Sequence, residues 1–252
     1  MYLYAECVTD EVLTLSSTKF STFTEMKLDD IRELAATVFS KSCVLDPLPS
    51  SIIKQCTDLL LPTITNIFNL PLPEGCMPTC LKSAVFLPLL KQPDVDFLQF
   101  KNFRPTSNLK AQSKIIEKSV ALQLNNYLMN NNLHENFQSA YKVHHSTETV
   151  MVKVQDDILH AIDGNKVVVL LMLDLSAAFD TVSREIPLDR LSQRYGITGS
   201  SVKEWFASYL SSRAQFVQIE CSRSSLRELN CGVPQGSVMG LCYMFCTPFT
   251  CG

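Results

Sequence analysis

Two acidic residues in the second half of the chain are the first candidates for chemistry. Asp174 follows the apolar run KVVVLLML at residues 166–173, and Asp180 comes six residues later, after small residues at 176–178. A carboxylate at the end of a buried strand is held rigidly at a half-open site, where it can bind a hard cation such as Mg²⁺. Asp also commonly caps turns and helices, so this spacing alone favours a structural role.

A glycine-rich segment further along is the second candidate. GVPQGSVMG at residues 232–240 holds three glycines, a proline and two polar side chains in nine positions. Glycine lets backbone N–H groups approach a base pair or a phosphate closely, and the amide of Gln235 can both donate and accept hydrogen bonds. Taken alone, the segment is equally compatible with a surface turn.

Helices and strands must position these residues. Apolar residues at helical spacing predict helices that begin near residues 31, 50, 116, 147, 188 and 201, with a break at Pro62 and a capping box formed by Ser201 and Glu204. Ser146 or Thr147 is predicted to cap the helix that begins near 147. Strands are predicted at 83–90, at 166–175 and in a hairpin of 216–220 with 226–229, and a loop is predicted at 91–105. Because the run at 166–175 is continuously apolar, we expect it to be buried on both faces.

Composition limits the class of protein. The 252 residues are 46% hydrophobic and 19% charged, which predicts a globular chain, and the net charge of −3 gives no strong basic field. The ten cysteines lack zinc-finger spacing, so free thiols are favoured over a metal site. The N-terminus does not have the pattern of a signal peptide, and the longest apolar run is too short for a membrane span. We therefore expect an intracellular protein, in the nucleus or cytoplasm, with no membrane partner.

The order of several motifs resembles one family. LDLSAAFDTV at 173–182 and GVPQGSVMG at 232–240 resemble palm motifs A and B of LINE-type (non-LTR retrotransposon) reverse transcriptases. NFRPTSNL at 102–109 is similar to their finger motif, with Phe in place of the usual Tyr. FQSAYKVHHSTET at 137–149 is similar to their template-grip motif, with Ala, Tyr and Lys in place of the usual Gly, Phe and Arg. The resemblance extends over roughly residues 20–252.

This resemblance implies an α+β fold of the right-hand polymerase type. It implies a helical N-terminal extension at residues 1–80, a fingers-like region at 81–165 and a partial palm at 166–252, which carries motifs A and B. It also implies an RNA template, a DNA primer and deoxynucleotides as partners, and Mg²⁺ as the cofactor. We expect the sheet of the palm to be antiparallel, with Asp174 on a central strand.

The family assigns roles to the residues that match motif A. Asp174 would be a ligand of both catalytic Mg²⁺ ions, and the carbonyl of Leu175 would add a further ligand. Phe179 matches the aromatic steric gate that excludes a ribose 2′-hydroxyl, with packing in the core as its alternative role. Asp180 would organise the loop near the site rather than bind metal.

Other roles follow from the finger, grip and B motifs. Arg104 matches the arginine that clamps the incoming triphosphate, since its guanidinium presents a fork of donors to phosphate oxygens. Gln235 and Gly236 match the loop that lies against the nascent base pair. Lys142 matches a contact to the template backbone. Lys82 and Lys91 could assist, although lysines are more often simply solvated.

The family's third palm motif, an aromatic residue and x-Asp-Asp, does not follow motif B before Gly252. We therefore expect these residues alone to be inactive in primer extension. One alternative is a non-catalytic nucleic-acid-binding or protein-interaction module derived from the polymerase. Another is an unrelated α/β enzyme that uses Asp174. The near-neutral charge argues against a strong nucleic-acid-binding module, and the order of the motifs argues against an unrelated enzyme.

Overall fold

A computed structural model describes residues 18–39, 43–134, 139–140, 144–172 and 183–240 of the chain. The fold is α+β, as predicted, with helices and one mixed sheet. In the N-terminal part the helices are α1 (Leu28–Val38), α2 (Ser50–Gln55) and α3 (Thr57–Asn69), followed by the 3₁₀ turn η1 (Thr79–Leu81). Further along are η2 (Phe100–Asn102), α4 (Ala111–Asn130), α5 (Thr147–Asp163), α7 (Glu185–Gln193) and α8 (Ser200–Leu210).

The sheet is built around the strand β1 (Ser83–Leu90). On one side β1 pairs antiparallel with β2 (Phe103–Leu109), and on the other it pairs parallel with β3 (Arg213–Ile219). The short strands β4 (Ser222–Arg223) and β5 (Arg227–Leu229) both pair antiparallel with β3. The sheet is therefore mixed rather than antiparallel, because the long connection between β1 and β3 allows the two strands to run in the same direction. β2 is an edge strand of this order.

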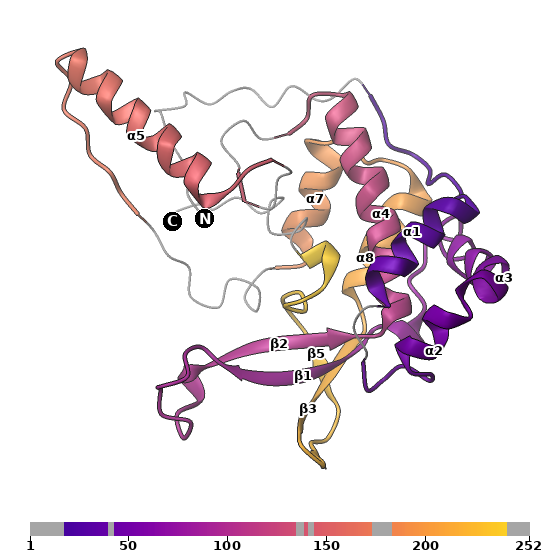
Figure 1. Cartoon of the computed structure of the whole chain (residues 1–252). Helices are drawn as coiled ribbons and strands as arrows, with labels where there is room; N and C mark the ends of the chain where they lie inside the picture. Colours follow the sequence, from indigo (N-terminus) through magenta and orange to yellow (C-terminus); the bar gives the residue numbers. More distant parts are fainter. Residues whose placement is uncertain (1–17, 40–42, 135–138, 141–143, 173–182, 241–252) are drawn as a thin grey trace.

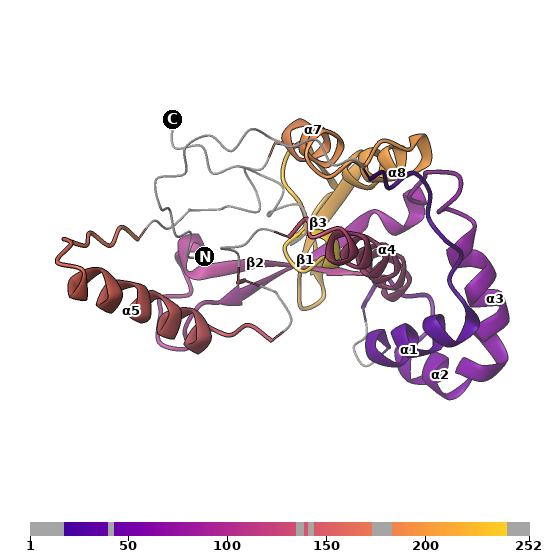
Figure 2. The same ribbon diagram turned by 90° about the horizontal axis from the view of Figure 1, so that it is seen from above.

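Helices gather at one end of the sheet, and the β1–β2 hairpin projects away from them (Figures 1 and 2). The helices α1 and α3 contact each other, and α1 also contacts α4, which follows β2 directly in the chain. In both views α5 stands apart from the other helices. No helix in the described ranges combines the length and the apolar character needed to cross a membrane.

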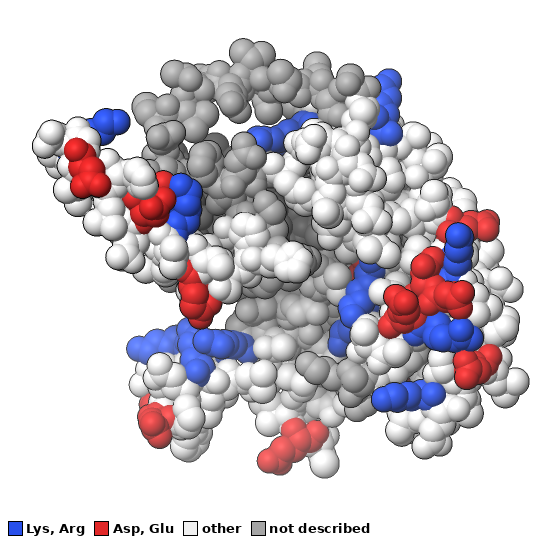
Figure 3. All heavy atoms as spheres, turned by 45° about the horizontal axis from the view of Figure 1, so that its top comes forward, with Lys and Arg blue, Asp and Glu red and all other residues white. Residues whose placement is uncertain are grey.

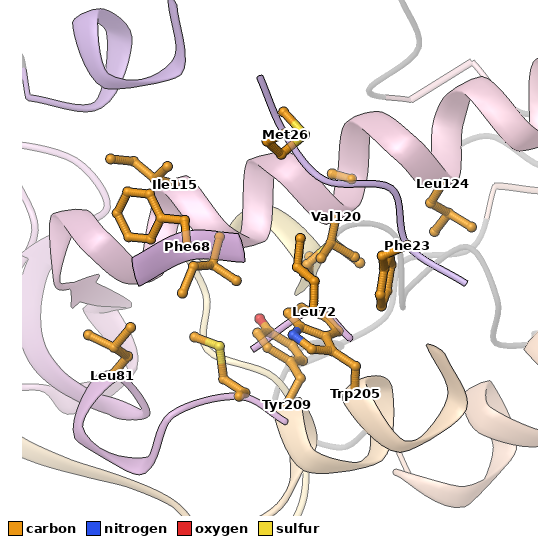
Figure 4. Close-up of a cluster of buried hydrophobic side chains, with 14 of the residues drawn as sticks. Phe23, Met26, Phe68, Leu72, Leu81, Ile115, Val120, Leu124, Trp205 and Tyr209 are labelled. Carbon is orange, nitrogen blue, oxygen red and sulfur yellow. The ribbon is translucent and has the colours of Figure 1, made fainter. Parts of the chain in front are cut away.

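The main core lies between α4, α8 and the segment that precedes α1 (Figure 4). Trp205 of α8 is fully buried and stacks on Tyr209, with ring centroids 5.4 Å apart and planes 12° apart. Val120 and Leu124 of α4 and Phe23 complete this part of the cluster. Each fully buried side chain of this size stabilises the fold by about 1.5–3 kcal/mol, so this cluster holds α4 and α8 together.

Several predicted boundaries are confirmed and others move. Ser146 caps α5 as predicted, since its Oγ accepts a hydrogen bond from the Thr149 amide, and Gly164 is the C-cap. The predicted capping box of Ser201 and Glu204 is wrong, because the N-cap of α8 is Gly199, two residues before Ser201, and has no side-chain capping hydrogen bond. A Cβ at Gly199 would lie 1.8 Å from the carbonyl oxygen of Ser21, so only glycine allows this close approach of the two backbones.

Two further predictions of local structure are wrong. Pro62 does not break a helix but lies inside α3, and the break falls at Cys56 between α2 and α3. The predicted loop at 91–105 is shorter, because η2 and β2 already occupy residues 100–105.

The predicted strand at 166–175 is also wrong over its described part. Residues 166–172 form no regular structure, and Val167 and Val169 are 94% and 87% exposed. A strand buried on both faces needs neighbouring strands for its backbone groups and covering layers for its side chains. None of the described strands pairs with this run. The residues that follow, 173–182, lie outside the described ranges.

Candidate functional site

The glycine-rich loop at residues 232–240 is docked on the edge of the sheet. The backbone N–H of Ser107 in β2 donates a hydrogen bond to the carbonyl oxygen of Gln235, at 2.7 Å. Gly236 has a φ of +119°, and a Cβ at this position would lie 2.6 Å from the Ser107 carbonyl oxygen. The loop thus covers the free edge of β2, and its close approach requires a glycine next to Gln235.

The other end of the loop is held by α4. The Glu117 carboxylate is fully buried and accepts hydrogen bonds from the backbone N–H groups of Val238, at 2.8 Å, and Met239, at 3.4 Å. The Ser113 hydroxyl donates a third hydrogen bond, at 3.0 Å. Burial raises the pKa of Glu117, while the positive charge of Arg213 and these hydrogen bonds act in the opposite direction.

Basic side chains lie in the interior behind the loop. The Arg213 guanidinium is fully buried, donates to the Tyr209 carbonyl at 2.8 Å and lies 4.5 Å from the centre of the Tyr209 ring. Arg184 donates to the carbonyl of Leu229 in β5. Lys82 is also buried, next to the Ser208 hydroxyl, and burial lowers its pKa. Lys82 is therefore an interior residue rather than a solvated phosphate contact.

A cavity of about 470 Å³ opens between the sheet and the loop. Its wall includes Phe86 of β1, Pro105 and Ser107 of β2, Gln215 of β3, and Gln235 of the loop. This volume lies in the range of small-molecule sites, and the wall mixes apolar surface with a few side chains that can form hydrogen bonds.

Arg104 and Gln235 are brought to the same strand. Arg104 lies in β2, three residues before Ser107, and is exposed. Because side chains alternate along a strand, Arg104 lies on the opposite face of β2 from Pro105 and Ser107, and it is not part of the cavity wall. Figure 3 shows Lys and Arg side chains grouped over the outer end of the β1–β2 hairpin, the part of the sequence that holds Lys91, Lys101 and Arg104.

The remaining predicted site residues are not placed. Asp174, Leu175, Phe179, Asp180 and Lys142 lie outside the described residues. Within the described part of the chain, no group of three or more His, Cys, Asp or Glu side chains could hold a metal ion. The roles expected for these five residues therefore stay predictions.

Sequence reasoning missed Glu117, although a signal was present. Ser113, Glu117, Val120 and Leu124 recur at helical spacing on the buried face of α4, so one ionisable residue interrupts a stripe of core positions. A charged residue in such a stripe is rarely buried without partners. The pattern predicts a buried carboxylate with hydrogen-bond donors, but it does not identify the donors.

Comparison with known proteins agrees with the family resemblance of the sequence motifs. Residues 90–246 match the family described as "Reverse transcriptase (RNA-dependent DNA polymerase)". The "RNA-directed DNA polymerase from mobile element jockey" of Drosophila melanogaster is 28% identical over 218 residues, which cover 84% of this chain and 23% of that protein. The "Probable RNA-directed DNA polymerase from transposon BS" of the same organism is 26% identical over 200 residues, which cover 79% of this chain and 22% of that protein. The chain therefore spans less than a quarter of the length of these relatives.

Proposed function

Since this chain belongs to the reverse transcriptase (RNA-dependent DNA polymerase) family, we propose that its β2 strand and its 232–240 loop hold the nascent base pair between an RNA template and an incoming deoxynucleotide. One observation carries the proposal. The hydrogen bond from Ser107 to Gln235 joins the strand of the finger motif to the loop of motif B. Two segments that resemble nucleotide-contacting motifs, far apart in sequence, thus meet at one strand.

Each of the residues matched to these motifs suits a part of the substrate. The Gln235 side chain and the glycine backbone at 236 suit the edge of a base pair, where an amide can donate and accept and where no side chain obstructs the approach. Arg104 suits the triphosphate, because its planar fork forms charge-assisted hydrogen bonds to phosphate oxygens. Lys142, by residue type and by resemblance, would contact the backbone of the template.

The proposal extends to residues outside the described ranges on the basis of their type alone. Asp174 and the carbonyl of Leu175 would be ligands of Mg²⁺, which supplies Lewis-acid chemistry at a phosphoryl centre when bound. Phe179 would lie beside the sugar and select deoxyribose, and Asp180 would organise the loop next to it. Phe179→Val should then relax discrimination against ribonucleotides in a polymerase that contains this segment.

Binding by the chain itself tests the proposal. The probe is a fluorescent RNA–DNA hybrid with a recessed primer 3′ end, and its affinity is measured by anisotropy at fixed salt, with and without the deoxynucleotide complementary to the next template base. We expect the complementary deoxynucleotide to tighten binding and a mismatched one to have no effect. Equal affinity with both nucleotides would refute the role in base-pair recognition, and would favour the non-catalytic binding module.

Variants separate the two contacts. Hydrogen bonds to charged groups contribute about 1.5–3 kcal/mol, so Arg104→Ala should weaken the effect of the deoxynucleotide roughly 10-fold or more. Lys101→Ala is the matched control, since Lys101 is an exposed basic residue on the same hairpin. Gln235→Ala should reduce the preference for the complementary nucleotide. If Arg104→Ala and Lys101→Ala behave alike, the triphosphate role of Arg104 is wrong.

A further inference from the structure

The stretch of the loop from Gln235 to Val238 is held at both of its ends. On one side, Ser107 of β2 binds the Gln235 carbonyl. On the other, three residues later, Glu117 of α4 binds the Val238 N–H, at 2.8 Å, and the Met239 N–H, at 3.4 Å. These contacts span sequence separations of more than 120 residues, so they form only in the folded chain.

We propose that Glu117 is a positioning residue that fixes the loop at 232–240, and with it Gln235, against β2. This inference rests on the proposed function in one respect only, namely that Gln235, once held in place, contacts the nascent base pair. Glu117 is not one of the residues that line the cavity, and its hydrogen bonds to the loop are made with the backbone of Val238 and Met239.

The two N–H groups need an acceptor that the loop does not provide. Val238 and Met239 begin a helical turn, and the first N–H groups of a helix have no partner within it. The Ser237 hydroxyl caps the turn but accepts from Gly240, at 2.9 Å. The Glu117 carboxylate therefore accepts the hydrogen bonds that the Val238 and Met239 N–H groups need. Because Glu117 is buried, water does not readily replace a hydrogen bond that is lost there.

Glu117 is itself fixed in one orientation. Its other oxygen, Oε1, is bonded to the Ser113 hydroxyl one turn earlier in α4, at 3.0 Å. The neighbouring residues Ile115, Ile116 and Val120 are fully buried or nearly so in the core. A rigid acceptor on a rigid helix defines where the turn at 238 begins, and the short connection from there leaves Gln235 little freedom.

This role requires an acceptor oxygen rather than a negative charge. Glu117→Gln keeps one oxygen for the Val238 N–H and presents an amide N–H₂ to the Ser113 hydroxyl. Glu117→Met has a similar length but no comparable acceptor. Val238→Pro removes the principal donor instead, and Pro is well tolerated at the first position of a helix, after a capping Ser237. Ser119→Ala is the control, because Ser119 is buried on the same helix and its hydroxyl donates to the Ile115 carbonyl of α4.

Amide hydrogen exchange of the 252-residue chain tests the inference, with the Ser107 amide as the remote reporter of the docked loop. We expect at least 10-fold faster exchange at Ser107 and Met239 in Glu117→Met, and at Ser107 in Val238→Pro. Glu117→Gln and Ser119→Ala should stay within about twofold of the wild type, as should the amides of α8 in every variant. If Glu117→Met does not fold, Val238→Pro decides by the same measurement.

Protection of Ser107 within twofold of the wild type in both Glu117→Met and Val238→Pro would overturn the inference. Exchange in Glu117→Gln as fast as in Glu117→Met would also overturn it, because charge rather than an acceptor would then be required. The hybrid-binding assay is read separately. A wild-type chain that ignores the complementary deoxynucleotide would refute the proposed function, while the exchange data would still decide the role of Glu117.

Discussion

Gly236 allows a quantitative test of how the loop at 232–240 is docked. Its φ of +119° lies in a region that residues with a Cβ rarely occupy, and its Cα lies directly against the backbone of β2. Replacing Gly236 by Ala adds a single methyl group at this point of contact. The substitution therefore strains the loop and removes no side-chain interaction that the wild type makes.

Two separate costs add up. Holding a non-glycine residue in such a backbone conformation costs about 1–3 kcal/mol. The new Cβ would lie 2.6 Å from the Ser107 oxygen, and ordinary contact begins at 3.4 Å, so the loop must move by 3.4 − 2.6 = 0.8 Å. That displacement weakens the 2.7 Å hydrogen bond from Ser107 to Gln235, which contributes about 0.5–1.5 kcal/mol. We therefore expect Gly236→Ala to lower the free energy of unfolding by about 2–4 kcal/mol.

Urea denaturation followed by circular dichroism measures this change. The control is Gly164→Ala, because Gly164 has a φ of −78° and a Cβ there would meet its nearest neighbours at 3.4 Å. At a compatible site this substitution changes the free energy of unfolding by no more than about 1 kcal/mol, in the stabilising direction. If Gly236→Ala costs less than about 0.5 kcal/mol, the loop is not docked on β2 in the way that the positive φ and close contact require.

Three further predictions concern the core and its ionisable residues. Trp205→Ala should lower the free energy of unfolding by about 3–5 kcal/mol, measured by urea denaturation, because it empties a fully buried site stacked on Tyr209. Tyr127→Phe should cost about 1 kcal/mol in the same assay, because the Tyr127 hydroxyl donates to the Tyr195 carbonyl at 2.7 Å; no loss would contradict that bond. Burial raises the pKa of Glu117 in the folded state, so the folded chain binds the proton more tightly. The stability of the wild type relative to Glu117→Gln should therefore fall as the pH rises above the ordinary glutamate pKa of 4.5, and a difference that is constant or grows with pH would contradict this sign.

The elements that sequence predicted well are those whose pattern and packing agree. In α4 and α8 the apolar residues recur at helical spacing, and both helices bury that face in one core. The same reasoning predicted the apolar face of α5 and its cap at Ser146, but α5 has no buried residue. Periodicity shows which face of a helix could be buried, and it carries no information about what covers that face.

The strand predicted over residues 166–172 is wrong for a related reason. Its β-branched and continuously apolar residues favour a strand, but a strand exists only with a partner for its N–H and C=O groups. Whether a partner is present depends on contacts between distant segments. The strand β1 was predicted correctly, and it has β2 and β3 as neighbours in the sheet.

The candidate site was predictable in part from its motifs. Resemblance identified Arg104 and Gln235, and the structure places Arg104 on β2 and docks the Gln235 backbone on the same strand. Ser107 and Glu117 create this arrangement through contacts with distant segments, and no local pattern identifies those segments. The partner of an edge-strand N–H, or the donor to a buried carboxylate, is known only once the fold is known.

The carboxylic acid at position 117 points to a specific role, because an apolar residue there would avoid the free-energy cost of burying an ionisable group. Burying an ionisable group incurs a desolvation penalty, and a well-packed apolar residue at such a site is often neutral or stabilising. The Arg213 guanidinium offsets part of this penalty, but Arg213 is itself fully buried. An apolar side chain would provide no acceptor for the turn at 238, and the loop could then occupy several orientations on β2. The glycine at 236 and the acid at 117 both restrict the loop to one position on β2.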